Sequence, residues 1–90
     1  MKARTKVKGG YVFFTYEVND LESHGSWKKA VKARDKYPNG FIILTGWVYS
    51  DWFGASERID ELELKDKPST EQVKRFMRSC YNVILHDQNI

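Results

Sequence analysis

The 90-residue sequence contains a single cysteine, Cys80, and only two histidines. One cysteine cannot form an intrachain disulfide, and one cysteine with two histidines cannot complete a four-ligand zinc site unless carboxylates or a second chain contribute. No apolar run approaches the ~20 residues that cross a bilayer, and the basic N-terminus lacks the apolar segment of a signal peptide. A lone thiol is typical of a reducing compartment. We therefore expect a cytoplasmic protein with no membrane partner and no cofactor.

Catalytic motifs are equally scarce. His24, Cys80 and His86 lie far apart in the sequence. Cys80 falls on the apolar stripe of a predicted helix, where a buried structural thiol is the more common role. The sequence has no phosphate-cradling glycine motif and no carboxylates at metal-ligand spacing. It therefore predicts a non-enzymatic protein, without catalytic residues and without a metal.

Charge is distributed unevenly along the chain, although the net charge is only +3. Residues 1–36 contain nine basic and four acidic residues, whereas residues 37–68 contain three basic and six acidic residues. Such a bipolar surface suits contact with a protein at least as well as contact with nucleic acid. The length allows one domain over residues 1–90, and a domain this small needs a well-packed core or a partner.

Hydrophobic periodicity predicts five elements. Residues 11–18 and 41–49 are dense in aromatic and β-branched residues and predict strands. Residues 26–37 place apolar side chains at helical spacing, and a second helix begins at Ser69 with the signature of a capping box. Residues 57–65 alternate imperfectly; we expect a third strand, with a helix as the alternative.

The sequence pattern leaves two alternative secondary structures open for each end of the chain. Residues 1–8 form a flexible arm or an edge strand, and residues 83–85 form a last strand or continue the second helix. The element order β-α-β-β-α(-β) predicts an α+β fold, a ferredoxin-like sandwich with an antiparallel sheet and two helices on one face. In that order the third strand is central and lies beside the first.

Strand alternation predicts which side chains the open face of the sheet carries. The aliphatic sets of the first two strands suit packing under the helices, which leaves an unusual amount of aromatic surface on the other face. The predicted partner-binding residues combine these side chains with the two aromatics of the following loop: Tyr11, Phe13, Trp47, Tyr49, Trp52 and Phe53.

An aromatic open face has two functional interpretations. It stacks bases, as in the RNA-binding RRM, or it forms a protein interface or homodimer seam. Glu61 and Glu63, on a central third strand, would repel phosphate and favour a protein. Nucleic acid remains the alternative through a separate basic patch of lysines on the first helix: Lys28, Lys29, Lys32 and Lys36.

One segment suggests a family. Residues 15–20, Thr-Tyr-Glu-Val-Asn-Asp, at the end of the first strand, resemble the strand end of the Cas2 and VapD ribonucleases, and residues 41–49 are loosely similar to their second strand. The resemblance covers about half of the chain and implies a ferredoxin-like fold with Glu17 and Asp20 as metal-binding candidates, across a dimer. This sequence has Glu17 where the family typically has Asp.

These observations lead to one function and two alternatives. We expect a small non-enzymatic binding protein that docks on another macromolecule, as do inhibitors or adaptors that phages and mobile elements use to block host or defence complexes. The first alternative is a sequence-independent nucleic-acid-binding protein. The second is a metal-dependent ribonuclease similar to Cas2 and VapD.

Overall fold

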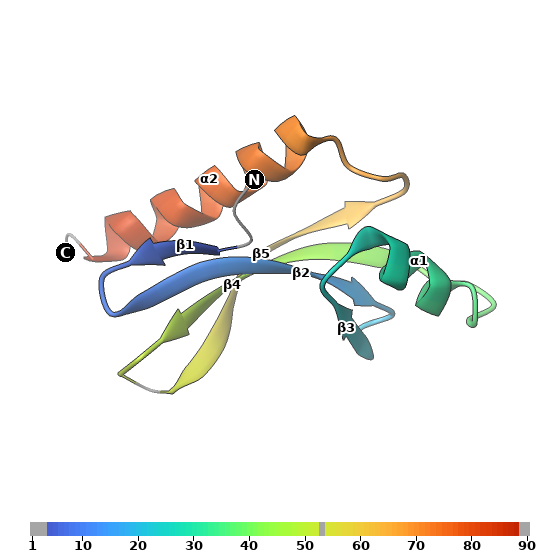
Figure 1. The fold of residues 1–90 in the computed structure, drawn as a ribbon, viewed down its shortest axis with the longest axis horizontal. Helices are drawn as coiled ribbons and strands as arrows, with labels where there is room; N and C mark the ends of the chain where they lie inside the picture. The colour runs from blue at the N-terminus through green and yellow to red at the C-terminus, as the bar shows by residue number, and fades with distance from the viewer. Residues whose placement is uncertain (1–3, 53, 89–90) are drawn as a thin grey trace.

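The structure, a computed structural model, describes residues 4–52 and 54–88, with side chains described up to residue 84 (Figure 1). Its elements follow the chain in this order: β1 (Arg4–Val7), β2 (Gly10–Val18), β3 (Glu22–His24), α1 (Trp27–Arg34), β4 (Ile42–Ser50), β5 (Ala55–Leu64) and α2 (Thr70–Gln88). The chain is thus an α+β fold with one antiparallel sheet, as predicted.

The strand order differs from the predicted ferredoxin-like order. β2 pairs with β4 over its whole length and β4 pairs with β5, so that β5 lies at an edge and not beside β2. β1 and β3 share the other edge of β2, β1 along its first half and β3 along its second half. The predicted central position of the third strand is therefore wrong.

A short hairpin after β2 accounts for this difference. Asn19 and Asp20 have φ of 54° and 57°, and Leu21 N donates to Val18 O at 2.9 Å. Positive φ at both central residues is the requirement of a type I′ turn, which reverses the chain into a strand. Because β3 reverses the chain before α1, β3 and β4 both run antiparallel to β2, and α1 connects these two strands across it. The second predicted strand therefore pairs directly with the first, whereas the ferredoxin-like order would place the third strand between them.

The predicted elements themselves are largely present. Of the predicted strand 57–65, residues 57–64 lie within β5, and residues 4–7 of the N-terminal segment form an edge strand, β1. α2 continues through residues 83–85, so the alternative of a last strand there is wrong. Both predicted helix starts are capped, since Ser26 Oγ accepts from Lys29 N at 3.3 Å and Ser69 Oγ from Gln72 N at 3.0 Å.

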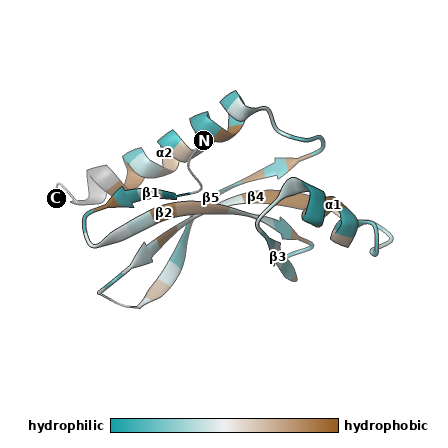
Figure 2. Ribbon diagram, viewed as in Figure 1, coloured by the Kyte–Doolittle hydropathy of each residue, from teal (hydrophilic) through white to brown (hydrophobic). Residues whose placement is uncertain are grey.

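Both helices cover the same face of the sheet, which Figure 1 shows in profile. Tyr16 of β2 meets Trp27 at the start of α1, with ring centroids 5.9 Å apart. Two residues before it, Phe14 pairs with Gly46 of β4, which lies directly beneath α2. Figure 2 shows hydrophobic residues concentrated along β2 and β4. The core is built from the helix-covered face of β2 and β4, the last residue of β5 and the inner sides of both helices: Val12, Tyr16, Val18, Ala30, Ala33, Ile42, Leu44, Leu64, Val73, Phe76, Met77 and Cys80.

Candidate functional site

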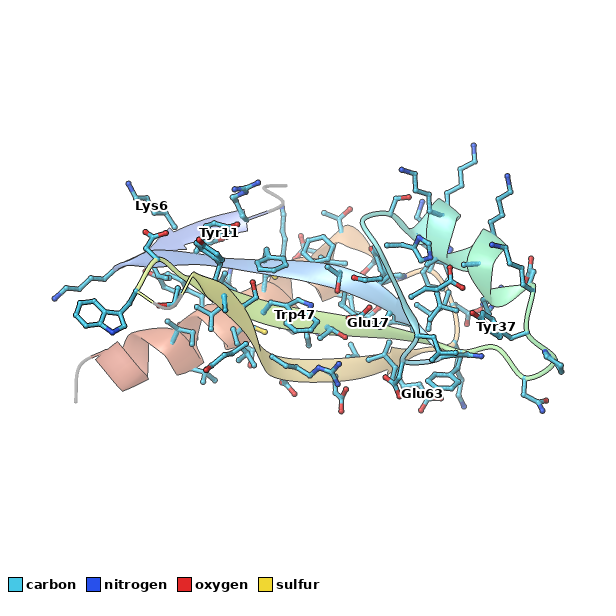
Figure 3. The ribbon with its side chains drawn as sticks, turned by 90° about the horizontal axis from the view of Figure 1, so that it is seen from below. Lys6, Tyr11, Glu17, Tyr37, Trp47 and Glu63 are labelled. Carbon is cyan, nitrogen blue, oxygen red and sulfur yellow. The ribbon has the colours of Figure 1, made fainter. Side chains whose placement is uncertain are left out.

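The opposite face of the sheet carries four aromatic rings, here called the aromatic cluster: Tyr11, Phe13, Trp47 and Tyr49. Cross-strand pairing brings them together, because Tyr11 lies opposite Tyr49 and Phe13 opposite Trp47. The ring centroids of these two pairs are 5.1 and 6.3 Å apart, and both pairs are stacked. Since all four side chains are half-buried and neither helix covers them, they form one continuous aromatic surface (Figure 3).

Two arginines flank the aromatic cluster from the neighbouring strands. Arg4 of β1 places its guanidinium carbon 4.6 Å from the centroid of the Tyr11 ring, and Arg58 of β5 lies 5.4 Å from that of Trp47. Both distances are within the range of cation–π attraction. The cluster therefore has a guanidinium at each side, and Lys6, opposite Tyr11, adds a third positive charge.

Trp47 is held in place by a hydrogen bond. Its indole N–H donates to Thr15 Oγ1, with 2.8 Å between Nε1 and Oγ1. This bond fixes the ring against the sheet, so a partner that packs on it does not have to order it first.

The other half of the open face is acidic. Glu61 and Glu63 of β5 are exposed and lie opposite Thr45 and Ile43 of β4, and Glu17 is buried in the adjoining part of β2. Figure 3 shows the two halves: Lys6 and Tyr11 at one end, Trp47 between, and Glu17 and Glu63 at the other. A single ion pair, Arg58 Nη1 to Glu61 Oε2 at 3.2 Å, joins them among the described residues.

Thr45 lies on the open face of β4, between the aromatic and the acidic halves, and its side chain is fully buried. Its Oγ1 has no hydrogen-bond partner within the described part of the chain. A buried hydroxyl without a partner costs about 1–3 kcal/mol, and valine has the same shape without the hydroxyl. We expect Thr45→Val to raise the free energy of unfolding by about 1 kcal/mol in urea denaturation.

Thr15→Val is the matched control for this prediction. It makes the same chemical change one strand away, but it removes the acceptor of the Trp47 indole N–H. It should therefore lower stability. Equal losses in both variants would show that the Thr45 hydroxyl has a partner.

Trp52 and Phe53 follow β4 directly. Trp52 is 88% exposed in the turn between β4 and β5. This turn is tied to the one between β1 and β2, because Asp51 N donates to Gly9 O at 2.8 Å. Trp52 thus lies at the same end of the sheet as Tyr11 and Tyr49, whereas Phe53 lies outside the described residues.

The residues proposed for other roles lie elsewhere. Lys28, Lys29, Lys32 and Lys36 are exposed on or just after α1, away from the aromatic cluster. Glu17 is buried on the open face and Asp20 is exposed in the turn after β2. Within residues 4–52 and 54–84, no three His, Cys, Asp or Glu side chains come together in a group that would hold a metal ion.

Cys80 is buried under the sheet, as predicted, and burial raises the pKa of its thiol to about 11. Only the thiolate is nucleophilic. At pH 8 the folded protein should therefore react with Ellman's reagent on the order of 100-fold more slowly than the same chain in guanidinium chloride. Similar rates in both conditions would contradict the burial of this side chain.

Two contributors to the site, Arg4 and Arg58, were not predicted. Arg4 and Lys6 alternate along β1, and this spacing alone places both on one face. No comparable sequence pattern predicts that Arg58 lies beside the aromatic cluster. Its position depends on a register shift in the pairing of β4 with β5 beside Trp47.

Comparison with protein-family models, curated proteins and solved structures finds no match to this chain. The similarity of residues 15–20 and 41–49 to Cas2 and VapD therefore stands on those short segments alone, and the ferredoxin-like order that it implied differs from the observed order. No helix among the described residues is both long and apolar enough to cross a membrane.

Proposed function

We propose that this chain is a non-enzymatic protein that docks on another protein through the open face of its sheet. The observation that carries the proposal is the aromatic cluster with Arg4 and Arg58 on its two sides. Tyrosine, tryptophan and arginine are the residues that contribute most to protein interfaces. Trp47 is also oriented by Thr15 before any partner arrives.

The charges of the open face favour a protein over nucleic acid as the partner of this surface. A phosphate backbone is negative along its whole length, so it would meet attraction near Arg4 and repulsion near Glu61 and Glu63. A protein surface can carry both signs. The partner should therefore present acidic groups to the aromatic end and basic groups to the other end.

The finer role follows from this mode of action. A protein that only docks changes its partner by covering a surface of it, which is how an inhibitor or an adaptor of the phage type acts on a host or defence complex. A reducing, cytoplasmic location is part of the same proposal, because the chain's only cysteine is a free thiol.

Affinity capture from the native host tests the proposal. The wild-type chain, the variant Trp47→Ala and the control variant Leu21→Ala are used as bait, and captured proteins are quantified by mass spectrometry. A protein that wild type and Leu21→Ala retain and Trp47→Ala loses supports docking through this face. Equal capture by all three chains contradicts it, and light scattering reports whether the partner is a second copy.

A further inference from the structure

A shallow depression of about 200 Å³ lies between β3 and α1, and it is distinct from the open face. It is lined by His24, Lys29, Lys32, Ala33 and Lys36. Lys29 and Lys32, at i and i+3, lie on one side of α1, and Lys36 follows two residues after the helix ends. Three of the four lysines predicted as a basic patch thus surround one concave surface, whereas Lys28 is not part of its lining.

The close contacts of the nearest carboxylates, Glu22 and Asp35, are with side chains other than the three lysines. Glu22 accepts a hydrogen bond from Tyr37 Oη at 2.6 Å, and its other oxygen lies 3.2 Å from His24 Nε2. The Tyr37 hydrogen bond is the main cause that lowers the pKa of Glu22, followed by the His24 hydrogen bond and then the charge of Lys36, so Glu22 offsets part of the charge at Lys36 alone among the three lysines. Asp35 faces Arg34, with 3.6 Å between Oδ1 and Nε. Among the described residues, Lys29 and Lys32 form no ion pair, and no carboxylate lines the depression.

We infer that this depression is a binding site for phosphoryl groups. Lysine ammonium groups bind phosphate as point charges and need no special backbone geometry. A phosphoryl group carries more than one negative charge, so it suits a concave surface lined by three lysines better than a single carboxylate does. The group belongs either to a nucleic-acid backbone or to a free polyphosphate.

A salt titration with a labelled DNA duplex of arbitrary sequence tests the site. For three phosphate contacts, the logarithm of the binding constant should fall with the logarithm of salt concentration with a slope of roughly −2.7. Lys32→Ala should reduce the magnitude of the slope by about 0.9 and weaken binding roughly eightfold at 0.1 M salt. Lys74→Ala removes the same charge from an exposed position on α2 and should change neither quantity.

Pyrophosphate separates the two sources of the phosphoryl group. If it displaces the duplex from wild type, the site accepts a nucleic-acid backbone. If calorimetry shows that wild type binds pyrophosphate and Lys32→Ala does not, and if the duplex does not bind, the ligand is a small polyphosphate. The inference is overturned if neither probe binds at 0.1 M salt, or if Lys32→Ala and Lys74→Ala weaken binding equally. Trp47→Ala should still bind both the duplex and pyrophosphate. Failure of the phosphoryl site is therefore distinguishable from failure of the proposed protein docking.

Discussion

Gly46→Ala is expected to lower the free energy of unfolding by about 1–3 kcal/mol, and Gly46→Val by more. A Cβ atom at residue 46 would overlap Cys80 Sγ and lie 3.3 Å from Phe76 Cε2, because α2 packs directly on the backbone of β4. The added methyl group must therefore push the helix from the sheet. In a chain of this length each kcal/mol lowers the melting temperature by ~4–8 °C.

The sign of this effect is diagnostic. In a strand without such a contact, replacing glycine by alanine stabilises a protein by roughly 0.5–1 kcal/mol, because glycine loses more backbone entropy on folding. Gly25→Ala, in the bend between β3 and α1, is the control for the added methyl group, since a Cβ there would meet nothing within 4 Å. Replacing Cys80 by Ala in the Gly46→Ala background removes the overlapping sulfur and should restore part of the loss. A Gly46→Ala variant as stable as wild type would contradict this packing.

Gly46 also shows why the two faces of the sheet could be predicted from the sequence. β2 and β4 pair over nine residues without a register shift within their ladder, so side chains alternate strictly between the helix-covered and open faces. Gly46 falls on the covered face, where α2 needs a residue without a side chain. Tyr11, Phe13, Trp47 and Tyr49 fall on the open face for the same reason. Periodicity is sufficient where pairing is regular.

The same periodicity fails in β5. Glu61 and Glu63 lie on the open face, and strict alternation would continue that face with Ile59. The register shift instead pairs Asp60 with Gly46 and Arg58 with Trp47, so that Ile59 is an extra residue of β5. This irregularity moves Arg58 onto the aromatic cluster. A bulge depends on how two strands fit together, so the sequence of one strand does not predict it.

The strand order could not be predicted from the sequence for a related reason. β3 has three residues, Glu22, Ser23 and His24, and none of them favours a strand by hydrophobicity or β-branching. It exists because the turn at Asn19 and Asp20 brings it against the free edge of β2. A polar strand of this length is indistinguishable from a loop in sequence, and yet it reverses the chain and decides the position of every later strand.

Trp47→Ala is expected to raise the dissociation constant for the captured partner at least ~30-fold, the equivalent of about 2 kcal/mol. Three contacts support this value: the Thr15 hydrogen bond, the stacked Phe13 ring and the Arg58 guanidinium. Each holds the indole in one orientation, so wild type loses little side-chain entropy on binding. Alanine removes the ring and also leaves Thr15, Phe13 and Arg58 without their contact to it. Calorimetry on the purified partner measures the change.

Leu21→Ala controls for the loss of an exposed apolar side chain, since Leu21 is 73% exposed in the turn after β2, at the far end of the sheet from the aromatic cluster. It should change the affinity less than twofold. Thermal melting of each variant must show a folded chain, because Trp47 is half-buried. If Trp47→Ala retains full affinity and Trp52→Ala loses it, the partner binds the turn between β4 and β5, and the open face is not the docking surface. A loss with Trp47→Ala that Trp52→Ala does not share locates the partner on the sheet.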